Sequence, residues 1–334
     1  MKISANNINF KGYDALPLKK LHIASSWGKI EDELFDVSKR EGFEVKTSLY
    51  NGSFNQDCKV ILERDKKPIL LMEECGDFFQ EHVPAIMLQY GMNAQLFSLN
   101  QRNLGFVQGG NFFIGKYPNG EKWMMIGSRE KFFSDRTSQI SKFYDIKEEN
   151  IFYVQQQDYH LDLSVRPIGY PYVLVNNPKL ALEYRNKAHG YNKPLNNREL
   201  NKIAPQMAIY KRNIKELERA GFKPIPIGGV FEAGINFINA VVNMHEDKSI
   251  SYITNSSKCD SKNISKYQDI FEQELRKKLK QIGLTDKNSP KLRDIYFIQG
   301  ENYGESNELM DNLIGGAGGI HCMSLEEPNF DVWV

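Results

Sequence analysis

The sequence repeats one unit five times: the apolar spacing of an amphipathic helix, then a stop signal, then a short apolar strand. The fifth helix shows the pattern best, because its apolar residues recur mostly every three or four positions and share one face. These residues are Tyr267, Ile270, Phe271, Leu275, Leu279 and Ile282. Lys and Arg dominate the other face, and Gly283 is expected to end the helix.

The four other helix–strand units follow the same order. The first helix carries Ile30, Leu34 and Val37 and ends at Gly42, before a strand at 43–49. The next two units are a helix to about residue 90 with a strand at 94–99, and a helix at 135–144 with a strand at 151–155. The fourth helix carries Ile209, Ile214 and Leu217, ends at Gly221, and precedes a strand at 223–227.

Hairpins are predicted between these units, because pairs of short apolar segments flank polar turn sequences. The paired segments are 58–63 with 69–73, 111–115 with 122–127, 161–166 with 172–176, and 236–243 with 250–254. The fifth unit is followed only by a strand at 319–325, and its missing partner is expected at 21–25, which would close a ring. Five strand–strand–helix–strand modules predict a cyclic α/β propeller; an ordinary α/β sheet with antiparallel edges is the alternative.

Charge and cysteine content narrow the class of protein. The 43 Lys and Arg residues nearly balance the 42 Asp and Glu residues, which argues against a nucleic-acid partner. No apolar run is long enough to span a membrane, and the first residues lack the apolar core of a secretory signal. The four cysteines show no paired spacing, so a reducing cytoplasm is the expected location. We expect one domain over residues 1–334, and the sequence permits an oligomer without identifying an interface.

Polar side chains gather at one place in each repeat, where the helix–strand unit ends and the next hairpin begins. The five segments are 55–57, 108–111, 158–162, 236–239 and 315–322. In a cyclic repeat, equivalent positions converge on the axis. Residues that are distant in sequence are therefore expected to share one pocket.

Cys322 is the predicted nucleophile of this pocket. The glycine-rich run at 315–319 lets the backbone pack closely and leaves the thiol accessible, and the thiol needs a base to become a thiolate. His160 and Asp162 are two residues apart, so on a strand both side chains would face the same way. His160 suits proton transfer near neutral pH, and Asp162 could orient it or bind a cationic substrate. The alternatives are a buried structural cysteine and a surface turn.

No metal and no cofactor are predicted. A metal site would rest on the His-x-Asp pair alone, since no Cys and His pair has zinc-finger spacing. The glycine-rich run lacks the Lys-Ser/Thr of a P-loop and follows a helical stretch where that motif requires a strand.

At these residues the sequence resembles the agmatine deiminase and bacterial peptidyl-arginine deiminase family. Residues 318–328, Gly-Gly-Ile-His-Cys-Met-Ser-Leu-Glu-Glu-Pro, are similar to its C-terminal cysteine signature. Four further segments resemble its other motifs in the same order: Phe54-Asn55-Gln56-Asp57, Gln108-Gly109-Gly110-Asn111, Tyr159-His160-Leu161-Asp162 and Phe237-Ile238-Asn239. The family's fold is the pentein, a five-module α/β propeller with pseudo-fivefold symmetry, which agrees with the repeat count.

The resemblance implies a cysteine-dependent deiminase that converts a guanidinium to a ureido product and ammonia through a covalent thiouronium. Cys322 would attack the guanidino carbon, and His160 would protonate the leaving nitrogen and then deprotonate water. Asp57 and Asp162 would grip the guanidinium. The remaining substrate contacts are expected from Phe54, Gln108, Asn111 and Asn239.

The substrate itself is left open among agmatine, free arginine and peptidyl arginine. Phe54 replaces a usual tryptophan, Gln108 stands where many agmatine deiminases have a glutamate, and Gln56 and Asn111 are closer to the peptidyl-arginine branch. The candidates for binding a substrate carboxylate are Arg102, Arg129, Arg136 and Arg166.

Three other functions compete with a deiminase. An amidinotransferase of the same fold would differ only in using an amine instead of water, and a catalytically silent pentein would act as a binding protein. An unrelated thiol protease would need a cysteine that precedes its histidine and lies on a helix. Here the histidine comes first, and Cys322 is expected to open a strand.

Overall fold

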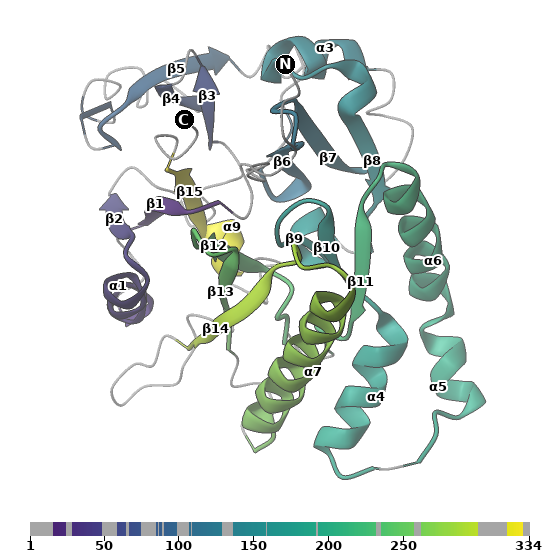
Figure 1. The fold of residues 1–334 in the computed structure, drawn as a ribbon. Helices are drawn as coiled ribbons and strands as arrows, with labels where there is room; N and C mark the ends of the chain where they lie inside the picture. The colour runs from purple at the N-terminus through teal and green to yellow at the C-terminus, as the bar shows by residue number, and fades with distance from the viewer. Residues whose placement is uncertain are drawn as a thin grey trace.

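The computed structural model describes residues 16–24, 29–48, 59–64, 67–74, 85, 87–88, 90–98, 107, 109–128, 136–157, 159–191, 193–231, 235–256, 262–299 and 319–329. Within these residues, the strands form five separate three-stranded sheets. The sheets surround a common centre that holds the short helix α9 (Ile320–Met323) (Figure 1). The predicted five-module α/β propeller is therefore confirmed.

Every sheet repeats one strand order, in which the central strand pairs antiparallel with one neighbour and parallel with the other. A parallel pair requires a crossover connection, which explains the helix in each predicted module. The sheets, with the central strand in the middle, are β15 (Ser324–Pro328), β1 (Leu18–Ala24), β2 (Glu44–Ser48); β3 (Lys59–Arg64), β4 (Lys67–Glu74), β5 (Asn93–Ser98); β6 (Phe112–Lys116), β7 (Lys122–Ser128), β8 (Ile151–Gln155); β9 (Val165–Pro167), β10 (Tyr172–Asn176), β11 (Lys223–Ile227); and β12 (Ala240–Met244), β13 (Ser249–Asn255), β14 (Lys291–Ile298).

The ring closes where β15 pairs antiparallel with β1, in a register that sets His22 opposite Leu325. This confirms the expected partnership between the last strand and a strand near the N-terminus. The predicted strand at 319–325 is wrong over its first part, because residues 320–323 form α9 and the strand begins at Ser324.

Four of the five predicted helices correspond to α1 (Lys29–Glu41), α3 (Thr137–Tyr144), α6 (Ala204–Arg219) and α7 (Ile264–Thr285). The remaining helix, expected to end near residue 90, lies mostly outside the described residues. Gly42 and Gly221 follow their helices with positive φ angles of 77° and 83°, the left-handed conformation that favours glycine at a helix end. Gly283 does not end α7 as expected. Its φ is not positive, and the helix continues to Thr285, where the Asp286 N–H donates to the Ile282 carbonyl at 2.8 Å.

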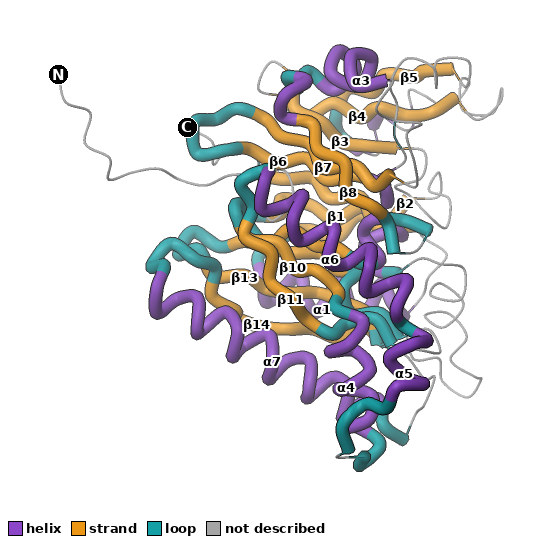
Figure 2. The backbone as a smooth tube through the Cα atoms, turned by 90° about the vertical axis from the view of Figure 1, so that its right-hand side faces the viewer, coloured by secondary structure: helices purple, strands orange, loops and turns teal. Residues whose placement is uncertain are grey.

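The fourth module contains two helices that the sequence pattern did not identify, α4 (Pro178–Ala188) and α5 (Asn197–Lys202). The Asn177 side chain accepts from the N–H groups of Lys179 and Leu180, and Pro178 occupies the first helical position, so Asn-Pro was an available start signal. Figure 2 shows α4, α5 and α6 together on one side of the molecule.

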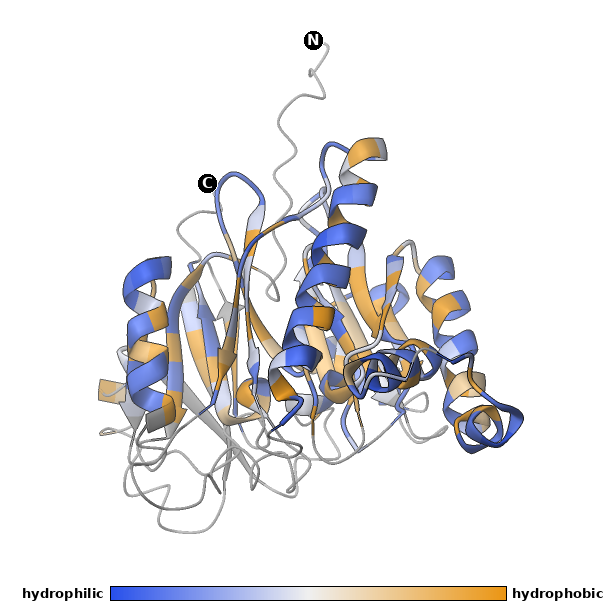
Figure 3. Cartoon of the chain, turned by 90° about the horizontal axis from the view of Figure 1, so that it is seen from below, coloured by the Kyte–Doolittle hydropathy of each residue, from blue (hydrophilic) through white to orange (hydrophobic). Residues whose placement is uncertain are grey.

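The core lies between the sheets and the helices that cover them. The α7 face predicted from its spacing is buried at Tyr267, Ile270, Phe271, Leu275 and Leu279, which pack with strands of the fourth and fifth modules. Much of the helix surface turned to solvent is hydrophilic, while the strands carry hydrophobic residues (Figure 3). Among the described helices, none is both long and apolar enough to cross a membrane.

Candidate active site

Cys322 lies on α9, a single helical turn at the centre of the propeller. The first N–H groups of a helix have no partner within it; here the N–H groups of Ile320 and His321 donate to Asn255 Oδ1 at 2.6 Å and Asn239 Oδ1 at 2.9 Å. The expectation that the cysteine opens a strand is therefore wrong, because side chains of the fifth module hold this segment as a helical turn.

Gly319 is needed because the backbone of α9 approaches these two asparagines closely. A Cβ atom at Gly319 would lie 2.5 Å from Asn239 Oδ1 and 2.6 Å from Asn255 Nδ2. Gly319 thus serves close packing, as expected. The expectation that this segment leaves the thiol accessible is wrong, because Cys322 is buried.

His160 and Asp162 do not lie on a strand, which corrects a second expectation. His160 has an extended backbone, and Asp162 belongs to the 3₁₀ turn η6 (Leu161–Leu163), which the Ser164 N–H closes by donating to the Leu161 carbonyl at 3.0 Å. The structure nevertheless brings His160, Asp162 and Cys322 together, with their nitrogen, oxygen and sulfur atoms within 4.8 Å of one another. All three are buried.

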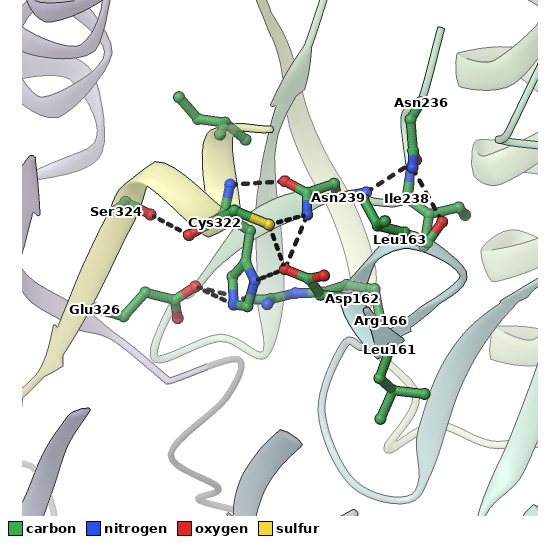
Figure 4. A network of polar contacts seen from close by, with 12 residues as sticks. Leu161, Asp162, Leu163, Arg166, Asn236, Ile238, Asn239, Cys322, Ser324 and Glu326 are labelled. Carbon is green, nitrogen blue, oxygen red and sulfur yellow. Dashed lines mark hydrogen bonds and ion pairs between the residues drawn. The ribbon is translucent and has the colours of Figure 1, made fainter. Parts of the chain in front are cut away.

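The two oxygens of the Asp162 carboxylate have different surroundings (Figure 4). Oδ2 accepts from Asn239 Nδ2 at 2.9 Å and Cys322 Sγ at 2.9 Å, and a 2.8 Å hydrogen bond joins it to His321 Nδ1. Oδ1 is buried and has no hydrogen-bond partner among the described residues. A buried carboxylate oxygen in this condition favours a ligand with N–H donors.

Burial raises the pKa of the Cys322 thiol well above its usual range, and the charge and hydrogen bond of Asp162 raise it further. The Asn239 amide donates to Sγ at 3.1 Å and opposes this only in part. Among the described residues, the groups around the thiol therefore favour its protonated form, and a positive charge beside it would favour the nucleophilic thiolate.

His160 is buried with both ring nitrogens lacking a hydrogen-bond partner among the described residues. Its ring lies against Tyr159, with 4.3 Å between centroids, and against the backbone of Gly110, where a Cβ atom would overlap Nδ1. The described neighbouring groups therefore hold the ring by packing rather than by hydrogen bonds to its nitrogens.

Asn111, expected at the substrate, supports the segment that carries His160. Its Oδ1 accepts from Gln156 Nε2, which also donates to the Tyr159 carbonyl. A substrate contact by Asn111 stays a prediction. Asn239, expected in the same role, contacts both Asp162 and Cys322.

The sequence analysis missed His321, although it belongs to the same glycine–histidine–cysteine segment. Its Nε2 lies 3.6 Å from Glu326 Oε1, which pairs with Arg166 Nη2 at 2.9 Å. The Arg166 side chain is fully buried, and its guanidinium carbon lies 5.4 Å from the centre of the Phe113 ring. Arg166, one of four candidates for a substrate carboxylate, is thus committed to Glu326 behind His321.

Several expected site residues lie outside the described residues: Phe54, Asp57, Gln108, Arg102 and Arg129. Arg136 is described and stands at the N-cap of α3.

Among the described residues, one group of side chains could also ligate a metal ion, namely His160, Asp162 and Cys322. Of these side chains, the Asp162 carboxylate already has three hydrogen-bond partners at Oδ2.

No family model matches this chain, and no curated protein matches it in sequence. Solved structures do match in fold. Campylobacter jejuni agmatine deiminase has a TM-score of 0.55 at 11% identity, covering 95% of this chain and 96% of its own. A substrate-bound serine-for-cysteine variant of that enzyme has a TM-score of 0.53 at 11% identity, covering 94% of each chain.

A Porphyromonas gingivalis protein whose assignment as an arginine deiminase is provisional has a TM-score of 0.51 at 10% identity, covering 96% of this chain and 99% of its own. At these identities the likeness establishes the fold alone. The pentein fold implied by the sequence motifs is therefore confirmed.

Proposed function

We propose that this chain is a cysteine-dependent deiminase that hydrolyses the guanidinium of an arginine-derived substrate. The observation that carries the proposal is the buried cluster of Cys322, His160 and Asp162, whose reactive atoms lie within 4.8 Å of one another. The cluster offers a nucleophile, an acid/base and a carboxylate in one place. The fold shared with C. jejuni agmatine deiminase supports the same chemistry.

The carboxylate selects a guanidinium. Asp162 Oδ1 has no hydrogen-bond partner among the described residues, and a planar cation with fixed N–H donors matches such an acceptor. Asp57 is proposed as the second carboxylate that binds the guanidinium, and it lies outside the described residues.

The substrate's charge would also activate the nucleophile. A guanidinium at Asp162 offsets the burial and negative charge that raise the pKa of Cys322, so the thiol proton passes to His160 as substrate binds. Sγ then forms a bond to the guanidino carbon. The C–N bond to the leaving nitrogen breaks, and His160 protonates that nitrogen, which departs as ammonia.

Hydrolysis of the resulting S-alkylthiouronium completes the reaction. His160 removes a proton from water, the hydroxide adds to the same carbon, and the C–S bond breaks to return the Cys322 thiolate. The products are one ureido compound and one ammonia for each water consumed.

The test is an assay for ammonia and ureido product with agmatine, free arginine and a short arginine-containing peptide. We expect product from at least one substrate with wild type and with the control Cys259→Ala, and none with Cys322→Ala at an unchanged circular-dichroism spectrum. Product formation by Cys322→Ala would refute the mechanism. A folded wild type that is silent on all three substrates would count against the function.

A further inference from the structure

His321 directly precedes Cys322 on α9, and hydrogen bonds fix its main chain on both sides. Its N–H donates to Asn239 Oδ1 at 2.9 Å, and its carbonyl accepts from Ser324 Oγ at 3.1 Å. The residue is buried. The imidazole ring is therefore carried by a backbone with little freedom to move, and α9 sets its direction towards η6.

The ring of His321 lies between two carboxylates. Nδ1 is 2.8 Å from Asp162 Oδ2, and Nε2 is 3.6 Å from Glu326 Oε1. An ionised carboxylate can only accept hydrogen bonds, so Nδ1 is the donor to Asp162. Arg166 Nη2 lies 2.9 Å from the same oxygen of Glu326 and fixes that carboxylate behind the ring (Figure 4). The ring is thus supported on one side while it donates on the other.

His321 differs from the two other groups that donate to Asp162 Oδ2, because both of those also belong to or contact the nucleophile. One is the Cys322 thiol itself, at 2.9 Å. The other is Asn239 Nδ2, which donates to Oδ2 at 2.9 Å and to Cys322 Sγ at 3.1 Å. Under the proposed function the thiol proton leaves before Sγ attacks, so that donor is lost. The ring N–H is not consumed in this step and can continue to hold Oδ2.

We propose that His321 is a positioning residue of the deiminase reaction, which holds the Asp162 carboxylate so that Oδ1 stays directed at the guanidinium while Cys322 bonds to carbon. The inference rests on the proposed function, in which Asp162 binds the guanidinium. The two oxygens belong to one planar group, so a hydrogen bond that fixes Oδ2 also fixes the direction of Oδ1. Oδ1 is buried without a hydrogen-bond partner among the described residues, and the orientation of the group therefore depends on the contacts at Oδ2.

Two amide substitutions separate the two nitrogens of the ring. The amide nitrogen of His321→Asn can take the place of Nδ1, which keeps a donor for Asp162. The amide nitrogen of His321→Gln instead reaches the place of Nε2 and faces Glu326, so the donor to Asp162 is lost. Both variants remove the ring from Phe113, whose ring centre lies 5.6 Å from that of His321, so their losses of packing are matched.

The first measurement is kcat/KM on the guanidine that wild type hydrolyses, with a thermal melt of each variant. We expect a roughly hundredfold loss in His321→Gln, because displacements of about 1 Å at a reacting centre have effects of this size. His321→Asn should stay close to wild type, and the two variants should melt at similar temperatures. His245→Gln is the control and should keep wild-type kcat/KM, since its Nε2 lies 3.0 Å from Glu41 Oε2, a histidine–carboxylate pair outside the Cys322 cluster.

The second measurement is calorimetric binding of agmatine and arginine to Cys322→Ala carrying each substitution. His321→Gln should bind the guanidine roughly tenfold more weakly than His321→Asn does, because Asp162 is no longer held for it. Hydrolysis by wild type with equal losses in both variants, with no loss in either, or with the same loss in His245→Gln, would overturn the inference and leave the deiminase.

Binding separates these outcomes from failure of the proposed function. If wild type hydrolyses no guanidine and the Cys322→Ala background binds one, selectively weaker binding by His321→Gln keeps the positioning of Asp162 and removes the deiminase. Equal binding by the two variants would overturn the positioning as well. A chain that neither binds nor hydrolyses any of these compounds would overturn both proposals.

Discussion

The two oxygens of the Asp162 carboxylate differ in their hydrogen-bond partners. Under the proposed function, this difference would let one carboxylate be held in place by the protein and also bind the substrate. Oδ2 is tied to Asn239, His321 and Cys322, which fixes the orientation of the group. Oδ1 is buried without a hydrogen-bond partner among the described residues. The protein thus bears the cost of desolvating this carboxylate, and under the proposed function the substrate would supply the missing donors.

Asp162→Asn is expected to weaken agmatine and arginine binding by roughly ten- to a hundredfold in the Cys322→Ala background. The reason is the loss of a hydrogen bond between two charged groups, which contributes about 1.5–3 kcal/mol. Calorimetry measures the change, with Asp145→Asn as a control at a side chain that is 93% exposed. If affinity is kept, and turnover falls when Asp162→Asn is made in the enzyme that retains Cys322, Asp162 orients the histidine and does not bind substrate.

Gly319→Ala is expected to lower turnover roughly a hundredfold while the protein still folds. The added Cβ would lie 2.5 Å from Asn239 Oδ1, so α9 or Asn239 must shift, and displacements of about 1 Å at a reacting centre have effects of this size. Steady-state kinetics and a thermal melt measure the two properties. Unchanged turnover would show that the position of Cys322 does not depend on this close approach.

Strands and helices whose signal is local could be predicted from the sequence. The strands β8 and β11 and the buried face of α7 follow from apolar spacing, and Gly221 marks the end of the helix before β11. The site turns could not, because their conformation depends on partners far along the chain. Asn239 and Asn255 hold α9 across 82 and 65 residues, so a glycine-rich segment that reads as a strand becomes a helical turn.

The same reasoning explains which site residues could be identified. Cys322, His160, Asp162 and Asn239 were found because each repeat places them at an equivalent position, and the structure brings all four together. His321 was missed because its contact with Asp162 requires η6 and α9 to face one another, which no spacing rule predicts.

Gly283→Ala tests whether Gly283 lies inside α7, and it should stabilise the protein by about 0.5–1 kcal/mol. Glycine within a helix loses more conformational entropy on folding than alanine does. Among the described residues, the atom nearest to a Cβ at Gly283 would be Ser289 Oγ at 3.5 Å, which is ordinary contact. Chemical denaturation measures the change. A loss of stability would mean that α7 ends at Gly283 after all.

The whole propeller depends on the seam between β15 and β1, because this sheet joins strands from opposite ends of the chain. The seam contains a buried polar pair in which His22 Nε2 lies 2.9 Å from Glu327 Oε2, and Lys20 Nζ approaches the same oxygen at 3.4 Å. The His22 ring stacks on Tyr90 of the second module at 4.6 Å. Closure was predictable from the count of modules, whereas this buried pair was not, since it forms only once the register is set.

Protonation of this seam should make the propeller less stable in acid. Burial lowers the pKa of His22 despite the opposing effect of Glu327, so protonating His22 opposes folding. Burial alone would raise the pKa of Glu327, but the hydrogen bond with His22 and the nearby charge of Lys20 lower it, so its ionised form favours folding. Both contributions are present at neutral pH. The contribution of His22 is lost as the pH falls below about 6.5 and that of Glu327 as it falls below about 4.5, the pKa values of these groups in unfolded chains.

Thermal melts of wild type, His22→Gln and His189→Gln across this range test the seam. Wild type should lose stability from about pH 6.5 downward, and His22→Gln should lose less over the first part of the range because the titrating ring is gone. At neutral pH, His22→Gln should be destabilised by about 1–3 kcal/mol, since Glu327 loses a buried partner. His189→Gln, at an exposed histidine outside the seam, is the control. Equal slopes for wild type and His22→Gln would show that acid acts on the propeller elsewhere than at its closing sheet.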